Sequence, residues 1–148
     1  MVLNKVTMEI SKANKEDFAY IKGKLKKYLL DATDIDWRQF FVVRLKNKIV
    51  AFGRIIDRGD CLEIASVGVD YYHRRKGIGK RLVNYLLEIA KEIDGKKPIY
   101  AVTHLPKFAQ SCGFVQIQDN CPSSLEYKRK HLCRLDESKI KIMRWMGV

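Results

Sequence analysis

The sequence is poor in features that would divide it or carry it across a membrane. Its three prolines and nine glycines are scattered among 148 residues, and no low-complexity run or internal repeat separates two halves. The first residues lack the basic start and long apolar core of a signal peptide, and no apolar run approaches the roughly 18 residues of a membrane span. We therefore expect one domain over residues 1–148, in a cytoplasmic protein with no membrane partner.

Closely spaced metal ligands are also missing. The cysteines form no C-x-x-C pair and no zinc-site spacing with histidine; they are Cys61, Cys112, Cys121 and Cys133. We expect no metal, and we expect reduced thiols that are mostly buried.

Negative charge is in short supply. The chain has 29 Lys and Arg against 17 Asp and Glu, a net charge of +12, which favours polyanionic partners. A basic surface of this size fits nucleic acid, an anionic membrane face or a phosphorylated cofactor, and it also fits a surface that is charged only for solubility. The local arrangement of the cations must decide among these.

The spacing of apolar residues predicts the order β-α-β-β-β-α-β-α-β-β, with a further basic helix before the last strand. Strands are predicted at 5–13, 39–45, 48–57, 61–69, 98–103, 113–118 and 138–146. Helices are predicted at 14–30, opened by a capping Asn14, from about 76 to 93, at 106–112, and within 122–135. A strand that enters a loop, a helix and then a second strand is a right-handed crossover unit.

The stretch HRRKGIGKRL, residues 73–82, sets five cations around two glycines. Gly77 and Gly79 leave room for an anion to approach the backbone, at a helix start whose unpaired N–H groups favour negative charge. The surrounding charge comes from Arg74, Arg75, Lys76, Lys80 and Arg81. The loop is therefore predicted to hold a phosphate. It is neither a P-loop nor the dinucleotide fingerprint, since Leu82 stands where that fingerprint needs a third glycine.

The pattern that remains is R-x-x-G-x-G at Arg74, Gly77 and Gly79, directly after a strand. It resembles the signature of the GNAT superfamily of acetyl-CoA-dependent N-acetyltransferases. The stretch VGVDYYHRRKGIGKRLV is similar to the central motif of that family, and FAQSCGFVQI is similar to its following helix and strand. The resemblance implies an α/β protein with the GNAT acyltransferase fold. In that fold a mixed, mostly antiparallel central sheet with splayed strands 4 and 5 is flanked by helices.

The resemblance also implies acetyl-CoA as cosubstrate. Its pyrophosphate would bind the backbone amides of Arg75, Lys76, Gly77, Ile78, Gly79 and Lys80. Arg74 would pair with the phosphate or brace the loop. Val67 and Val69 would bind the pantetheine arm as an added strand, and the Val67 amide would stabilise the oxyanion of the thioester carbonyl.

An acceptor ammonium must lose a proton before it can attack, and Glu63 is the predicted base. Glu63 lies eleven residues before Arg74, the offset at which several members of the family carry a catalytic glutamate. Strand alternation predicts that Glu63, Ala65, Val67 and Val69 share one face. The alternative is that Glu63 is a surface residue or a structural ion-pair residue on a solvated strand face.

The general acid has no candidate at its usual place. The family carries a tyrosine four residues before the glycine of the GF pair, and this sequence has Ala109 there. Water, Tyr71, Tyr100 or no protein group at all remain open. Cys112 is more simply read as a buried thiol, and His73 and His104 as residues of a loop and a strand end, than as catalytic groups.

The acceptor is predicted as a small-molecule amine. VTHLPKFAQSCGF and PSSLEYKRKHLCRL resemble the amino-acid N-acetyltransferase branch associated with arginine biosynthesis, which implies an amino acid. Asp31, Asp34 and Asp36 could line an acidic acceptor site or a solvated loop.

Two other hypotheses stay open. One is a protein or peptide lysine acetyltransferase. The other is a basic nucleic-acid-binding module, which lacks aromatic platforms and DNA-reading motifs, so no specific nucleic acid is expected. The oligomeric state is open, with a homodimer among the alternatives.

Overall fold

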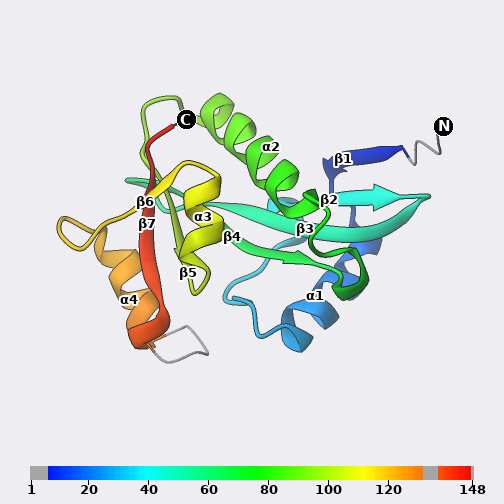
Figure 1. Cartoon of the computed structure of the whole chain (residues 1–148), viewed down its shortest axis with the longest axis horizontal. Helices are drawn as coiled ribbons and strands as arrows, with labels where there is room; N and C mark the ends of the chain where they lie inside the picture. The colour runs from blue at the N-terminus through cyan, green and yellow to red at the C-terminus, as the bar shows by residue number, and fades with distance from the viewer. Residues whose placement is uncertain (1–6, 132–136, 148) are drawn as a thin grey trace.

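The computed structural model describes residues 7–131 and 137–147, and within them the chain forms one seven-stranded sheet (Figure 1). The strands are β1 (Met8–Lys12), β2 (Phe40–Leu45), β3 (Lys48–Asp57), β4 (Leu62–Val69), β5 (Ile99–Thr103), β6 (Phe114–Gln116) and β7 (Lys141–Trp145). Their order is β1-β2-β3-β4-β5-β7-β6, and every neighbouring pair except β4 and β5 is antiparallel. The predicted mixed, mostly antiparallel sheet is confirmed.

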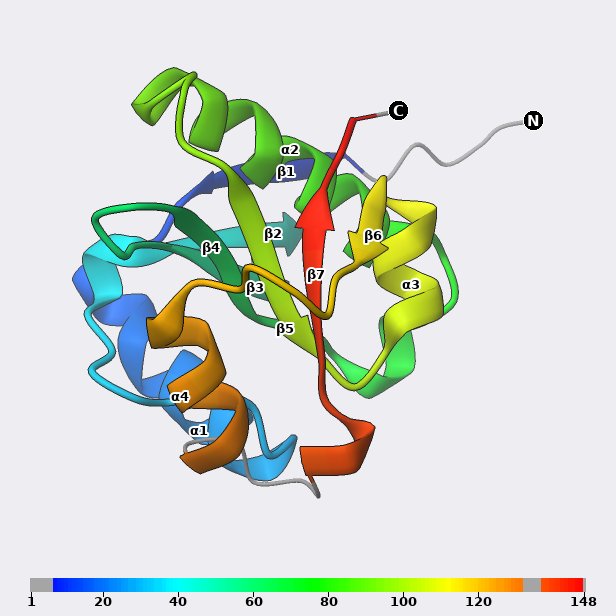
Figure 2. The same ribbon diagram turned by 90° about the vertical axis from the view of Figure 1, so that its left-hand side faces the viewer.

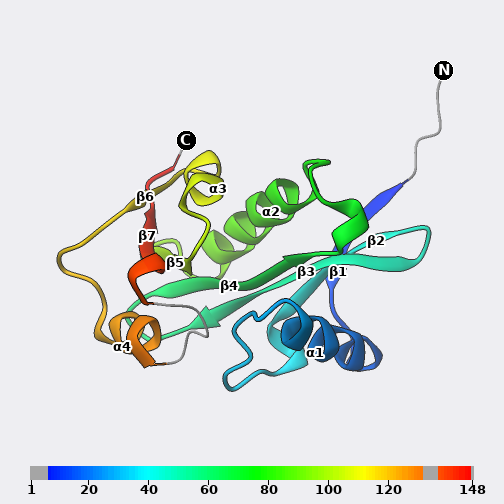
Figure 3. The ribbon, with the colours of Figure 1, turned by 60° about the horizontal axis from the view of Figure 1, so that its bottom comes forward.

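The helices lie on both faces of this sheet. They are α1 (Phe18–Lys27), α2 (Ile78–Ile93), α3 (Pro106–Ser111) and α4 (Ser123–His131). Figure 3 shows α1 and α2 on opposite faces. The Asn14 cap is confirmed: its side chain accepts from the Asp17 amide while the Asp17 carboxylate accepts from the Asn14 amide, and this reciprocal pair opens the short 3-10 turn that leads into α1.

Helices α1, α2 and α4 bury apolar side chains in three different core clusters. Leu82 and Leu86 of α2 belong to the largest core cluster, which also contains residues of β3, β4 and α3. Ile21 and Leu25 of α1 pack with Phe52 and other residues on the opposite face. Around β5 and β7 (Figure 2), Leu125 of α4 completes a third, smaller cluster. No helix in the described ranges is both long enough and apolar enough to cross a membrane.

Strands β4 and β5 diverge soon after they meet. In the described part of the chain they pair only through Leu62 with Ile99 and Glu63 with Tyr100. Beyond Glu63 the described residues place no strand beside this edge of β4, so its backbone groups on that side take no part in a strand ladder. The predicted splay between strands 4 and 5 is confirmed, and it positions the site described below.

A β-bulge in β4 overturns one prediction. Between the pairs Phe52–Gly68 and Arg54–Ala65 the register shifts, so β4 carries one residue more than β3, and Ser66 has a positive φ of 57°. An extra residue resets the two-residue alternation of a strand.

The bulge separates side chains that were expected together. Val67 and Val69 pack against the cluster under α2, whereas the carboxylate of Glu63 contacts Lys128 of α4 on the other face. The prediction that Glu63, Val67 and Val69 share one face is therefore wrong.

Candidate active site

The predicted phosphate loop lies between β4 and α2. Helix α2 begins at Ile78 after Gly77, which has a φ of 80°, and no side chain caps this end. The first N–H groups of the helix therefore lack acceptors within the helix. Arg74, Arg75 and Lys76 are exposed in the loop, so cations and unpaired amides gather at one place.

Arg74 braces this loop. Its Nε donates to the carbonyl oxygen of Val69 at 2.9 Å, and its guanidinium lies over the ring of Tyr28, 4.7 Å from the centroid. The second ring beneath it is that of Tyr71, at 5.6 Å. These contacts fix the loop against the end of β4.

Two cavities meet beside the splayed edge of β4. The first, which we call the loop cavity, encloses about 830 Å³ and is lined by the loop, the start of α2, and Val67 to Val69. The second, the inner cavity, encloses about 170 Å³ and reaches Asp31, Ser66 and Lys128. The residues common to both linings are Leu30, Val67, His104, Leu105 and Phe108. The two cavities are therefore adjacent at these five residues.

The backbone of β4 is oriented toward these cavities at two residues. The Asp70 amide donates to the carbonyl oxygen of Val50, on β3, at 2.8 Å. Because successive residues of a strand point their backbone groups to alternate edges, those of Val69 and Val67 point to the splayed edge. Eight of the nine predicted cofactor-binding residues line this one cavity: Val67, Val69, Arg74, Arg75, Gly77, Ile78, Gly79 and Lys80. The ninth, Lys76, is exposed in the same loop and is not part of the cavity lining.

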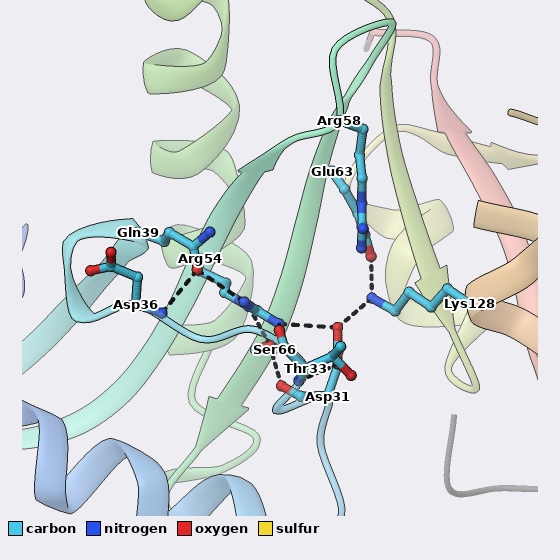
Figure 4. Close-up of polar contacts among 9 residues, drawn as sticks. All are labelled: Asp31, Thr33, Asp36, Gln39, Arg54, Arg58, Glu63, Ser66 and Lys128. Carbon is cyan, nitrogen blue, oxygen red and sulfur yellow. Dashed lines mark hydrogen bonds and ion pairs between the residues drawn. The ribbon is translucent and has the colours of Figure 1, made fainter. Parts of the chain in front are cut away.

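Glu63 is placed differently from the other predicted residues. Its side chain has 0% exposure and is not among the residues that line either cavity. Oε1 accepts from Arg58 Nε at 3.0 Å and from Nη2 at 2.7 Å, and Oε2 pairs with Lys128 Nζ (Figure 4). Each carboxylate oxygen must leave a cation before it can take a proton.

The contacts of Glu63 continue into a buried chain of charges. Lys128 Nζ lies 2.8 Å from Asp31 Oδ2, and Arg54 Nη2 lies 3.1 Å from the same oxygen. We call Arg58, Glu63, Lys128, Asp31 and Arg54 the ion chain. It alternates three cations with two carboxylates, and the side chains of Arg54 and Lys128 are only 1% and 3% exposed.

Neutral groups hold the far end of the ion chain. Arg54 Nε donates to Ser66 Oγ at 2.9 Å, Nη1 donates to Gln39 Oε1 at 2.9 Å, and Nη2 donates to the Thr33 carbonyl at 3.1 Å. Ser66 Oγ donates in turn to the Asp31 carbonyl at 2.6 Å. The bulge at Ser66 therefore places a hydroxyl where it joins Arg54 to the segment that carries Asp31.

Asp31 is held strongly in its ionised form. Burial opposes ionisation and is the largest single influence on this carboxyl. Lys128, the Thr33 amide and Arg54 together outweigh it and lower the pKa of Asp31 to about 2. A carboxylate with so low a pKa is a poor proton acceptor at neutral pH.

Acid should weaken the fold through Asp31. The folded pKa lies below the unfolded value of 3.8, so the stabilisation is present above that value and is lost as the pH falls toward 2, by about 2 kcal/mol. Urea unfolding of wild type and Asp31→Asn across this range measures it. The Asn variant should be less stable at pH 5 and should change less with acid. Equal pH dependence of the two proteins would contradict the assignment.

The other candidates named from the sequence do not reach the cavities together. Asp36 caps a 3-10 turn and pairs with Arg38 at the surface, and Asp34 is exposed, so Asp31 alone of the three aspartates lines the inner cavity. Tyr100 is buried among other side chains and Tyr71 is 66% exposed. Neither tyrosine is among the cavity-lining residues.

The cysteines behave largely as expected. Cys61 and Cys112 are buried free thiols and Cys121 is half-buried; Cys133 lies outside the described residues. Burial raises the pKa of the Cys112 thiol, and this thiol faces the inner cavity. Among the described residues, no three His, Cys, Asp or Glu side chains gather in a way that could hold a metal ion.

Sequence reasoning missed Arg54, Lys128 and the position of His104. An arginine in the middle of an apolar strand was a usable signal for Arg54, because such a residue is buried only with partners. Lys128 follows Leu125 by three residues and so shares its inward helical face, but the run KRK hid this. His104 gave no signal beyond its place after a strand.

The sequence pattern of the Acetyltransferase (GNAT) family matches residues 8–116. No curated protein sequence matches the chain at a significant level. Solved structures do resemble it.

One such structure is N-acetylglutamate synthase from Neisseria gonorrhoeae, complexed with coenzyme A and N-acetyl-glutamate. It is 17% identical with a TM-score of 0.77, over 96% of this chain and 35% of that one. The chain therefore spans about a third of that enzyme.

Two further structures have similar folds. Rv2747 from Mycobacterium tuberculosis, in complex with CoA and NLQ, is 20% identical with a TM-score of 0.72, and the match covers 95% of this chain and 99% of that one. A Bacillus anthracis protein described as a streptothricin acetyltransferase, in complex with acetyl coenzyme A, is 24% identical with a TM-score of 0.55, over 74% of this chain and 62% of that one. At these identities the likeness is one of fold.

Proposed function

This chain belongs to the GNAT family of acetyltransferases, and we propose that it transfers the acetyl group of acetyl-CoA to the amino group of a free amino acid. Transfer is direct, with both substrates bound together. The observation that carries this proposal is the pair of cavities that meet at Val67, one beside a cationic glycine loop and one ending at buried charges. Such a junction lets a thioester and an amine come into contact.

The loop cavity is the proposed place of the cofactor. Unpaired amides at the start of α2, together with Gly77 and Gly79, suit a pyrophosphate. The splayed edge of β4 offers the backbone groups of Val67 and Val69 to the pantetheine amides. The Val67 amide would then lie near the thioester carbonyl and stabilise its oxyanion.

The inner cavity is the proposed place of the acceptor. It is lined by one buried cation, Lys128, and one buried anion, Asp31, and opposite charges suit a zwitterion better than a simple amine. Lys128 has three N–H donors and uses two of them on Glu63 and Asp31. A cavity of about 170 Å³ fits a small molecule. The gonococcal synthase, which this chain resembles, holds N-acetyl-glutamate.

Glu63 remains the proposed base. Its carboxylate reaches the inner cavity only through Lys128, which contacts Glu63 and also lines the cavity. In this role the Glu63 carboxylate must release one of its paired cations before it takes up a proton. Replacing Glu63 should therefore affect both the stability of the fold and the turnover.

Acetyl-CoA should stabilise the protein against thermal unfolding. At 100 times its dissociation constant a ligand contributes about 2.7 kcal/mol. Gly79→Glu should lose all of this, because even a Cβ at that position would lie 3.3 Å from Val69 Cγ2 and 3.4 Å from Phe108 Cζ, and the added carboxylate repels phosphate. Gly23→Glu is the matched control, since Gly23 lies in α1 with nothing within 4 Å of a Cβ. No saturable shift of the wild type with acetyl-CoA or CoA would refute the cofactor proposal.

The acceptor is then identified by release of free CoA thiol across a panel of amino acids, polyamines and lysine peptides. Turnover with amino acids supports the proposal. Turnover with lysine peptides alone would favour a protein or peptide lysine acetyltransferase instead.

A further inference from the structure

The proposed reaction needs a proton for the departing sulfur, and the position of the usual tyrosine holds Ala109, which is buried. The required group must reach the point where cofactor and acceptor meet. Five described residues line both cavities, and they are Leu30, Val67, His104, Leu105 and Phe108. Only His104 among them has a side chain that can donate a proton to sulfur.

We propose that His104 is the general acid that protonates the thiolate of coenzyme A. This inference rests on the proposed function, because it assigns a role within the same reaction. It differs from the expectation drawn from the sequence, in which His104 was simply a residue at the end of a strand.

The fold holds His104 at the opening between β4 and β5. Strand β5 ends at Thr103, whose Oγ1 accepts from the Leu105 amide at 2.9 Å, and Leu105 directly precedes α3. This tight turn places His104 on the side where β5 has left β4. Its side chain is exposed, and neither ring nitrogen forms a hydrogen bond with any group in the described ranges. Both nitrogens are therefore available to a ligand.

The charged and titratable groups around His104 come from several elements. On the inner-cavity side they are Asp31, Cys112 and Lys128. On the loop-cavity side they are Tyr28, His73, Arg74, Arg75 and Lys80. Asp31 is already paired with two cations, so no unpaired carboxylate of the described residues lines either cavity. The cations of the loop have the phosphates of the cofactor as their expected partners. None of these groups forms a hydrogen bond with His104 in the described ranges, so its ring is free to contact the sulfur.

The proposed step balances without any other reactant. The lone pair of the amine forms a C–N bond to the thioester carbon, and the carbonyl oxygen becomes an oxyanion. When the carbonyl re-forms, the C–S bond breaks and its electron pair goes to sulfur, which takes the proton of the His104 imidazolium. Before the attack Glu63 takes one proton from the acceptor ammonium, and it later releases this proton to solvent. A second proton, lost by the nitrogen after the attack, returns the imidazole to its charged form. Counted from the neutral amine, one N–H is lost and one S–H is gained.

Two variants test this role. His104→Gln should still show the thermal shift with acetyl-CoA, while its kcat falls by roughly 10², the low end for a positioned acid, since a thiolate leaves readily. The alkaline fall in kcat, where an acid catalyst loses its proton, should disappear from its pH profile. His104→Ala should regain activity on addition of imidazole. The control is His131→Gln, because His131 is exposed on α4 beside Tyr127 and lines neither cavity.

A second measurement needs no acceptor. In protein labelled with ¹⁵N-histidine, acetyl-CoA should shift the ring signals of His104 and leave those of His131 in place. Unmoved His104 signals at saturating acetyl-CoA would overturn the proposal. So would an unchanged kcat in His104→Gln, or a lower kcat that keeps the wild-type pH profile and does not respond to imidazole. Failure of the wild type to bind acetyl-CoA would refute the proposed function instead.

Discussion

Replacing Lys128 by methionine should lower the free energy of unfolding by about 3 to 5 kcal/mol, the range for removing one partner of a buried ion pair. Lys128 stands between Glu63 and Asp31, so the variant leaves two buried carboxylates without the cation that separates them. Arg58 and Arg54 still hold the outer sides of the two carboxylates, which should keep the protein folded enough to measure.

Urea unfolding at neutral pH measures the effect, with Lys130→Met as the matched control. Lys130 is exposed on the same helix, and its replacement should change stability by no more than about 0.5 kcal/mol. The double variant Lys128→Met, Glu63→Gln should be less destabilised than the sum of its parts, because the amide removes one of the two unpaired charges. Equal effects of Lys128→Met and Lys130→Met would show that the ion chain contributes nothing to the fold.

Glu63→Gln should lower turnover by roughly 10² to 10⁴, the usual contribution of a positioned base. The amide keeps the shape of the side chain and cannot take a proton. Acetyl-CoA binding should persist, because Glu63 lines neither cavity. The defect should shrink as the pH rises, since an α-amino group loses its proton unaided near pH 8 and a lysine near pH 10.4.

The measurement is kcat against pH for both proteins at saturating acetyl-CoA, with chemistry shown to limit the rate. The pH at which the variant recovers also reports the class of acceptor. A defect of the same size at every pH would mean that Glu63 acts only by holding Lys128 in the ion chain. Glu63→Gln and His104→Gln should change opposite limbs of the profile, because one removes a base and the other an acid.

The order of the strands and helices could be predicted from local patterns in the sequence. Strand β3 is formed by the same residues, 48–57, that were predicted for it, and Asn14 caps the turn that leads into α1 as predicted. The phosphate loop was recognisable for the same reason, because its glycines and cations are neighbours in the sequence. Features whose partners are close along the chain can be predicted from it.

The ion chain could not be predicted in this way. Its contacts join Glu63 to Lys128 across 65 positions and Arg54 to Asp31 across 23, and only the folded sheet brings them together. The bulge at Ser66 adds to the difficulty, since one extra residue reverses which side chains face α2. A periodic reading of β4 therefore placed Glu63 and Val67 on the same face, and the structure separates them.

The two cavities are lined by different stretches of the chain, so the two binding sites of such a protein can evolve separately. The loop cavity takes most of its wall from residues 67–80, whereas the charges of the inner cavity come from Asp31 on one side of that stretch and Lys128 on the other. If the proposed function holds, substitutions near residues 31–39 and 123–131 can therefore alter the accepted amine while the lining of the loop cavity stays intact. Because Asp31 and Lys128 share one ion chain, a viable new specificity is expected to arise through paired exchanges of opposite charge, and single exchanges should be found mainly in unstable intermediates.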